Sequence, residues 1–238
     1  MTLPAARLGS VVLCVAMAAC GGGPSQPTQS SGGANNGGSG VTCRNYAATS
    51  TVTVQLNGLS SSSPATCSWD TNLHQLTCRV SVSSGGPVCA TTVSTYNSTA
   101  DFIDEIRVVP PALLRTSDVQ TADGSPACGA GNFQNISYVY DSQRRLTQVV
   151  NGPSTTTYSA WDPSGRPTQG SLPAGTPVTI AYDAGARTQT QTSGSGAGAV
   201  VATTTFDADG TPIKVVTVNA GTTTTVTTQV TSTGRICK

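Results

Sequence analysis

Ala160-Trp161-Asp162-Pro-Ser-Gly165-Arg166 is one copy of a short pattern that recurs along this chain of 238 residues. An aromatic residue is followed directly by aspartate at five places, which involve five of the eleven aromatic residues (2 Trp, 6 Tyr and 3 Phe). The five pairs are Trp69-Asp70, Tyr140-Asp141, Trp161-Asp162, Tyr182-Asp183 and Phe206-Asp207. The last four aspartates are separated by 21, 21 and 24 residues, and such a regular period indicates a repeated structural unit.

Each unit predicts a β-hairpin. A strand such as Val178-Thr-Ile-Ala-Tyr182 runs into Asp183, and an aspartate side chain can accept a hydrogen bond from a backbone N–H two residues further on. Glycine three residues after the aspartate, as at Gly165 and Gly210, permits the left-handed conformation that closes a short turn. The arginines four residues after the aspartate are expected to begin the return strand, with their stems over a neighbouring ring and their charged heads in water; they are Arg145, Arg166 and Arg187. A sixth, decayed unit is expected at Gly234-Arg235.

The pattern resembles the YD-repeat, or Rhs-type, family, whose motif is Tyr-x-Tyr-Asp-x-x-Gly-Arg-Leu. Tyr138-Val-Tyr140-Asp141-Ser-Gln-Arg-Arg145-Leu146 is the closest copy and has Arg144 in place of the glycine, whereas the copy at Trp161 has Pro167 in place of the leucine. The resemblance covers residues 136–238 and implies strips of antiparallel hairpins, which in large members of the family spiral into a closed shell. Five units are too few to enclose a cargo. We therefore expect a mainly β fold, an antiparallel meander of repeated hairpins that forms an open curved sheet.

The amino terminus indicates export. Leu8 to Ala19 is an apolar run of twelve residues, too short to span a bilayer as a helix but typical of a signal peptide. The run ends in Met17-Ala18-Ala19-Cys20, which resembles the bacterial lipoprotein signal and implies that Cys20 is lipidated. We expect a lipoprotein signal peptide at 1–19, a flexible Gly/Ser-rich tether at 20–41, and a location in the bacterial cell envelope, anchored to the outer membrane. The alternative is an ordinary secretory signal with a chance cysteine.

Six cysteines remain once Cys14 in the signal and Cys20 are set aside, and an even number in an exported chain predicts three disulfides. The six are Cys43, Cys67, Cys78, Cys89, Cys128 and Cys237. A hairpin with its turn near Asn72 and Leu73 would place Cys67 opposite Cys78, within bridging distance. The pairing of the other four is left open by the sequence, and we expect Cys43–Cys89 and Cys128–Cys237.

Residues 42–115 are expected to form a disulfide-braced β module, which is a diverged part of the same sheet. One segment departs from the β pattern: a capping residue at Ser98 and an apolar stripe at helical spacing predict a short helix near 99–107 that covers an open sheet face. Asp101, Asp104 and Glu105 form an acidic cluster there, which suits the first turns of a helix better than a pair of catalytic carboxylates. Residues 116–135, rich in glycine and proline toward their end, are expected to form a linking loop.

Composition excludes several function classes. Once Arg7 of the signal is set aside, the chain has 11 basic and 11 acidic residues. It therefore lacks the excess of positive charge that is typical of nucleic-acid-binding proteins. A single histidine, His74, excludes multi-histidine metal sites and leaves little material for histidine-based catalysis. No cofactor or metal is expected.

The sequence therefore predicts a non-enzymatic envelope lipoprotein with a structural or binding role. Its partners would be the membrane, through the lipid anchor, and a glycan or protein that contacts the sheet. Two alternatives remain open: an accessory of an Rhs-type toxin system and, with less support, an envelope hydrolase that uses Asp104 or Glu105.

Overall fold

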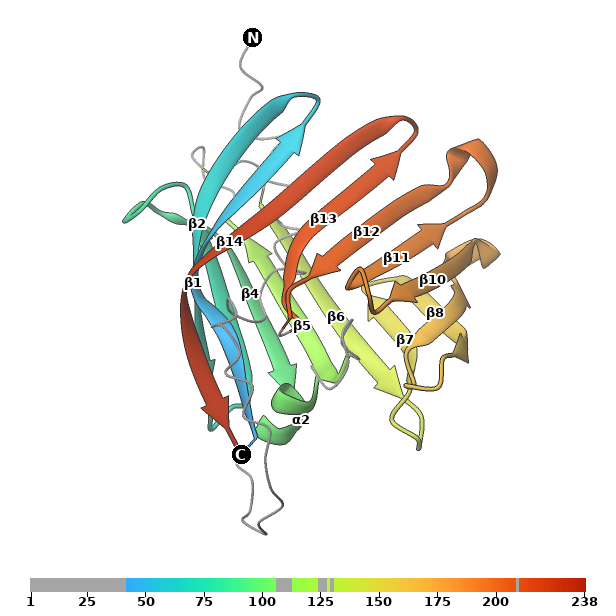
Figure 1. Ribbon diagram of the computed structural model, residues 1–238, viewed down its shortest axis with the longest axis horizontal. Helices are drawn as coiled ribbons and strands as arrows, with labels where there is room; N and C mark the ends of the chain where they lie inside the picture. Colours follow the sequence, from blue (N-terminus) through green and yellow to red (C-terminus); the bar gives the residue numbers. More distant parts are fainter. Residues whose placement is uncertain (1–41, 106–112, 124–127, 129–130, 209) are drawn as a thin grey trace.

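A computed structural model describes residues 42–105, 113–123, 128, 131–208 and 210–238. The described strands form one closed antiparallel barrel in which each strand pairs with its neighbours in sequence and β1 pairs with β14 (Figure 1). The mainly β, antiparallel meander expected from the repeats is confirmed. The open curved sheet is wrong: because residues 42–115 supply strands to the same sheet as the repeats, there are enough strands for the sheet to close on itself.

The strands are long at the seam and short in the repeat region. Their bounds are β1 (Cys43–Leu56), β2 (Leu59–Asp70), β3 (Gln75–Ser81), β4 (Val88–Tyr96), β5 (Arg115–Ala122), β6 (Asn132–Tyr140), β7 (Leu146–Asn151), β8 (Ser154–Trp161), β9 (Pro167–Ser171), β10 (Pro177–Asp183), β11 (Thr188–Ser193), β12 (Val200–Phe206), β13 (Pro212–Asn219) and β14 (Thr222–Cys237). The described helices are α2 (Thr99–Asp104) and two short 3-10 turns, η1 (Pro173–Gly175) and η2 (Gly196–Gly198). Thr-rich strands suit this arrangement because a β-branched side chain packs well on a pleated surface.

The first and last strands of the barrel meet at the seam. Cys43 at the start of β1 lies opposite Cys237 at the end of β14, and a disulfide joins them. Further along the same pair of strands, Tyr46 lies opposite Gly234. A Cβ atom at that glycine would lie 2.2 Å from the Cζ atom of Tyr46, so only glycine leaves room for the ring. The decayed repeat turn expected at Gly234-Arg235 is therefore wrong, because both residues lie inside β14.

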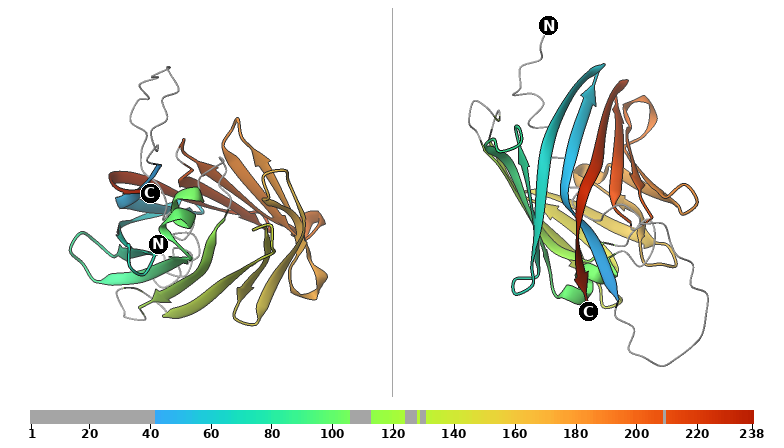
Figure 2. Two further views of the ribbon diagram at one scale, coloured as in Figure 1. Left: turned by 90° about the horizontal axis from the view of Figure 1, so that it is seen from below. Right: turned by 60° about the vertical axis from the view of Figure 1, so that its left-hand side comes forward.

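In an up-and-down meander, all connections that follow even-numbered strands lie at one end of the barrel. This Asp-turn end carries the five aromatic–Asp turns, the connection through α2 and the Cys43–Cys237 bridge, and it is the lower end in Figure 1. Seen from below, the strands run around a ring, and α2 lies within its outline on the side of β1, β4 and β14 (Figure 2). The helix expected near 99–107 is thus present as Thr99–Asp104, with the Ser98 side chain accepting a hydrogen bond from the Asp101 N–H. Instead of covering an open sheet face, it packs into one end of a closed barrel.

Phe102 of α2 is the most deeply buried aromatic residue of the described chain, with 0% exposure. Its ring contacts the rings of Tyr46, Trp69 and Tyr96, at centroid distances of 6.4, 4.4 and 5.3 Å respectively. Burying such rings contributes both apolar area and favourable edge-to-face geometry. Toward the opposite end the lumen is filled by small aliphatic side chains: Val52, Val54, Ala65, Val80, Ala90 and Val226.

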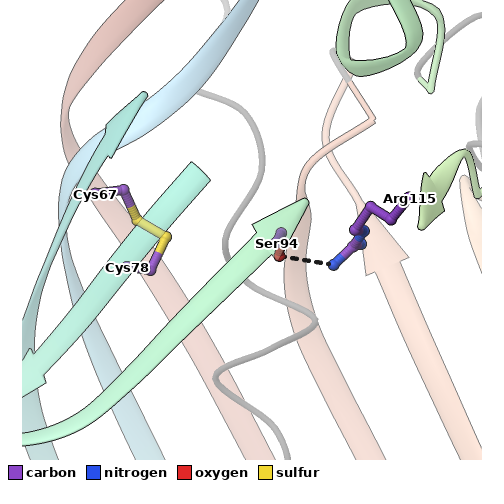
Figure 3. Close-up of a disulfide and its surroundings, with 4 residues drawn as sticks. All are labelled: Cys67, Cys78, Ser94 and Arg115. Atoms are coloured by element: carbon purple, nitrogen blue, oxygen red, sulfur yellow. Dashed lines mark hydrogen bonds between the residues drawn. A yellow bond between two sulfur atoms is a disulfide. The ribbon is translucent and has the colours of Figure 1, made fainter. Parts of the chain in front are cut away.

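Three disulfides brace the barrel. The pair expected from the hairpin, Cys67–Cys78, is present between β2 and β3, whose register places the two residues opposite each other (Figure 3). The other expected pairs, Cys43–Cys89 and Cys128–Cys237, are wrong, because the structure has Cys43–Cys237 and Cys89–Cys128. Closure of the sheet brings Cys43 and Cys237 together, and that contact cannot be foreseen from an open sheet.

Residues 116–135 are not simply a linking loop. They contain almost all of β5 and the first part of β6, and the two strands pair with each other. The disulfide-braced β module and the hairpin repeats consequently belong to one continuous barrel, in which β5 pairs with β4 on one side and with β6 on the other. The predicted signal peptide, the predicted lipidation site at Cys20 and the predicted tether lie outside the described residues.

Candidate functional site

The aspartates of the repeat organise the turns at one end of the barrel. At Asp141 and Asp162, one carboxylate oxygen accepts the backbone N–H groups of the residues two and four positions later, at 2.9 Å each. Asp207 accepts the N–H of Thr211 at 2.8 Å in the same way. The residue three positions after each of these aspartates has a positive φ, which explains Gly165 and Gly210.

Arginine and aromatic side chains then link successive hairpins into a ladder. The guanidinium of Arg145 pairs with Asp141 and lies 4.4 Å from the ring centroid of Trp161 in the next repeat. Arg166 pairs with Asp162 and lies 4.2 Å from the ring of Tyr182. Each such cation–π contact contributes about 0.5–2 kcal/mol, depending on how far the pair is removed from water.

The same rings also donate hydrogen bonds to backbone oxygens of the preceding hairpin. The Trp161 indole N–H donates to the Leu146 carbonyl at 2.8 Å, and the Tyr182 hydroxyl donates to the Pro167 carbonyl at 2.9 Å. The arginines lie over neighbouring rings as expected, but the guanidinium heads and not the stems face the rings. The charged head of Arg166 is also not in water, because its side chain is only 13% exposed. The repeat rings are therefore engaged in packing, and one face of Trp161 and of Tyr182 is covered by a guanidinium.

Of the three repeats with an arginine four residues after the aspartate, two depart from the arrangement at Asp162. After Asp183 the left-handed residue is Arg187 itself, which is exposed and lies in the turn, so the return strand starts at Thr188 and not at the arginine. At the first repeat the left-handed position is held by Arg144, whose guanidinium pairs with Asp101 of α2. The absence of the family's glycine there is explained by this contact, which ties the repeat region to the helix.

A network of buried charged side chains lies in the lumen beside α2. Glu105 is 3% exposed, and its carboxylate accepts hydrogen bonds from Arg44 at 2.7 Å, Tyr96 at 2.8 Å and Arg115 at 2.9 Å. Arg115 also reaches Asp118 at 3.1 Å and the Ser94 hydroxyl at 3.4 Å, the latter drawn in Figure 3. The network has two arginines and two carboxylates and is therefore neutral, which is what a buried cluster of charges requires.

Tyrosine hydroxyls complete the network. The Tyr138 hydroxyl donates to Asp118 at 2.5 Å, and the Tyr140 hydroxyl donates to the Arg115 carbonyl at 2.5 Å. Burial raises the pKa of Tyr96, Tyr138 and Tyr140 above their usual range, and the neighbouring carboxylates add to the effect. These tyrosines consequently remain protonated donors.

The electrostatics of Glu105 do not suit a general acid. Burial alone would raise the pKa of this carboxyl, but Arg115 and Arg44 outweigh burial and lower the pKa below its ordinary value. A glycosidase acid needs a raised pKa. The other two acids of the cluster are also paired, Asp101 with Arg144 and Asp104 with Lys238 at 2.6 Å, so all three fasten the helix to strands and turns.

The repeat half of the barrel encloses a cavity of about 300 Å³. Its walls come from β6 to β12, and its floor from the charged network through Glu105 and Arg115. Most of the lining is apolar, and polar atoms are contributed by Tyr158, Gln189 and Gln191 among others. This combination of an apolar hollow with a few convergent polar groups is typical of a small-molecule site.

Sequence reasoning named some residues of the lumen, such as Glu105, Tyr138 and Tyr182, as cluster or repeat residues but missed others. Arg44, Arg115 and Asp118 occur in polar stretches with no motif around them, and Tyr158 is not followed by aspartate. The sequence of β5 gave no signal, because the two residues buried there, Asp118 and Gln120, are polar and flank a partly exposed valine. His74 lies in the β2–β3 turn with a positive φ, as the hairpin predicted.

Comparison of the chain with protein-family models and with curated proteins found no match. Among the residues that the structure describes, no helix has the length and apolar character needed to cross a membrane. Within the same ranges, no three histidine, cysteine, aspartate or glutamate side chains are grouped so that they could hold a metal ion.

Proposed function

We propose that the protein is a non-enzymatic, lipid-anchored protein of the bacterial cell envelope, related to the YD-repeat proteins, that acts by binding. The luminal cavity is the observation that carries this proposal, because it is a preformed hollow in a barrel braced by three disulfides. A rigid scaffold favours binding, since little conformational entropy is lost when a ligand enters.

The arrangement of the aromatic residues supports binding in the lumen over binding on the outer surface. Trp161 and Tyr182 would be the natural platforms for a glycan, but a guanidinium already covers one face of each ring. We therefore propose that the ligand binds in the interior of the barrel and not on the surface of the sheet, where the sequence suggested contact with a glycan or protein.

The anchor is tested by metabolic labelling with a radioactive fatty acid in a Gram-negative host. Cys20→Ala is expected to abolish incorporation of label and to release the protein from the membrane fraction, because the thiol that takes the lipid is gone. Cys14→Ala is the matched control, since Cys14 lies in the signal run and its loss should leave labelling unchanged. Undiminished labelling of the Cys20→Ala variant would refute the anchor.

The accessory role in an Rhs-type toxin system is an alternative that the neighbouring genes can test. The envelope hydrolase has less support, because the carboxylates it would use are held in ion pairs and the pKa of Glu105 is lowered.

A further inference from the structure

We infer that the luminal cavity between β6 and β12 binds a small uncharged molecule that combines an apolar ring or chain with a hydrogen-bond acceptor. This inference rests on the binding role proposed above and identifies its site and ligand class. Three properties of the cavity support it: its charged groups are paired, some of its polar groups have no partner among the described residues, and it lies beside a hollow at the Asp-turn end.

Every charged side chain that lines the cavity already has an ionic partner. Glu105 is held by Arg44 and Arg115, and Arg115 is also held by Asp118. Arg166 pairs with Asp162 through two contacts, at 2.6 and 2.7 Å. A ligand with a net charge would be transferred from water into a lumen that offers it no charge of opposite sign. Such a transfer is costly, so the site favours a neutral molecule.

Tyr158 presents a hydroxyl group that the protein does not use. Among the described residues it has no hydrogen-bond partner, unlike Tyr138 and Tyr182, whose hydroxyls donate to Asp118 and to the Pro167 carbonyl. Burial raises the pKa of Tyr158, so the hydroxyl remains protonated and can donate to an acceptor in the cavity.

The position of the Tyr158 ring is set by its cross-strand neighbour. Tyr158 on β8 lies opposite Gly170 on β9, and a Cβ atom at Gly170 would lie 2.9 Å from the Cδ1 atom of the ring. The Tyr46–Gly234 pair at the seam uses the same device. In both cases glycine lets a tyrosine ring lie close to the neighbouring strand, and at Gly170 the Thr157 carbonyl oxygen, 2.4 Å from the same Cβ position, requires glycine as well.

A second polar group lies on the next wall. Gln189 on β11 is directly opposite Thr204 on β12, and both line the cavity. Within the described part of the chain, neither side chain makes a hydrogen bond to another protein group. Ile180, Leu146 and Val149 supply apolar surface around these groups, so a ligand with a ring and a carbonyl would satisfy both kinds of lining.

The cavity is adjacent to a hollow at the Asp-turn end. This hollow, of about 360 Å³, shares Leu113, Leu146, Arg166 and Pro167 with the cavity, and Arg144 and Gly165 from two successive turns also line it. The turns after Asp141 and Asp162 therefore lie beside both hollows, and we expect a small molecule to reach Tyr158 from this end of the barrel.

Photolabelling of the full-length lipoprotein, purified from membranes, tests the inference. Benzophenone is a neutral ketone with two rings, and 4-benzoylbenzoate is the same molecule with a carboxylate. Each is irradiated with the protein over a range of concentrations, and the labelled peptides are identified by mass spectrometry. We expect saturable labelling by benzophenone of peptides that contain Val149, Ile180 or Gln189, and a half-saturating concentration at least about tenfold higher for the carboxylate.

Two variants define the site. Ile180→Trp fills the cavity and should abolish luminal labelling, whereas Thr179→Trp, on the outward face one residue earlier, should leave it unchanged. Tyr158→Phe removes only the unused hydroxyl and should raise the half-saturating concentration for the ketone by roughly 2- to 10-fold without changing the melting temperature. This milder variant keeps the test valid if Ile180→Trp does not fold.

Three results would overturn the inference: labelling spread evenly over the outer surface, equal labelling by the carboxylate, or an Ile180→Trp variant that folds and is labelled like the wild type. If the protein incorporates fatty acid and melts normally but takes up neither ketone in the lumen, the luminal site is wrong. The anchored binding role would then fall to the outer surface.

Discussion

Removal of the Cys43–Cys237 disulfide tests how the barrel is closed, because this bridge joins the two strands that meet at the seam. The bridged residues are 194 positions apart, whereas those of the Cys67–Cys78 bridge are 11 apart. In the chain-entropy treatment of cross-links, loops of these lengths correspond to roughly 5 and 3 kcal/mol of stability respectively. The bridge at the seam should therefore contribute about 2 kcal/mol more than the hairpin bridge.

The measurement is guanidinium unfolding of two double variants, Cys43→Ala with Cys237→Ala and Cys67→Ala with Cys78→Ala. Double replacement avoids free thiols that could form new bridges. Because Cys78 is only 2% exposed, its replacement also loses packing worth about 1 kcal/mol, which narrows the gap but does not reverse it. A seam variant that is no less stable than the hairpin variant would refute the reasoning, since closing the longer loop would then contribute nothing extra.

Two further predictions concern the interior. Glu105→Gln should destabilise the protein by about 3 kcal/mol at neutral pH, because Arg44 and Arg115 are left buried without their shared carboxylate. The pKa of Glu105 is lower in the folded protein than its unfolded value of about 4.3. Its contribution to the free energy of unfolding is therefore complete above that unfolded value and is lost as the pH falls through the folded pKa. In urea unfolding, the difference in stability between the variant and the wild type should shrink below about pH 4. Gly234→Ala should lower the free energy of unfolding by about 1–3 kcal/mol, since the added Cβ would overlap the Tyr46 ring. Gly198→Ala is the control: its Cβ would have no atom within 4 Å, so the melting temperature should not change. Equal effects of the two substitutions would contradict the predicted overlap with the Tyr46 ring.

The local structure of the repeats could be predicted from the sequence because their determinants lie within a few residues. The aspartate, the left-handed residue and the arginine of a turn such as Asp162 to Arg166 are neighbours in the chain, and the structure contains the hydrogen bonds that the residue types suggest. The same holds for the Cys67–Cys78 hairpin and for the Ser98 cap of α2. Short-range chemistry was enough in each case.

Long-range pairing could not be predicted in this way. Closure depends on β1 finding β14 across 194 residues, and the partners of Glu105 are 61 and 10 residues away from it. β5 was missed for a related reason: its inward residues include Asp118 and Gln120, so the usual alternation of apolar and polar residues is absent. The carboxylate of Asp118 can face inward only because Arg115 and Tyr138 are there to pair with it.

The distribution of large side chains explains why the lumen is filled on one side and hollow on the other. In the amino-terminal half, Phe102 from α2 enters the barrel and packs against Trp69 and Tyr96, and the charges beside it are neutralised in pairs. No such helix follows the later hairpins within the described residues, and rings such as Trp161 lie at strand ends, where they lock one turn to the next. The inner faces of β10 to β12 carry residues of moderate size along most of their length, among them Ile180, Gln189 and Thr204, and the larger Tyr182 and Phe206 only near the turns, so a cavity remains. A repeat that places its large residues at the turns will leave space between its strands, and in this protein that space contains the hydroxyl of Tyr158, which has no hydrogen-bond partner among the residues that the structure describes.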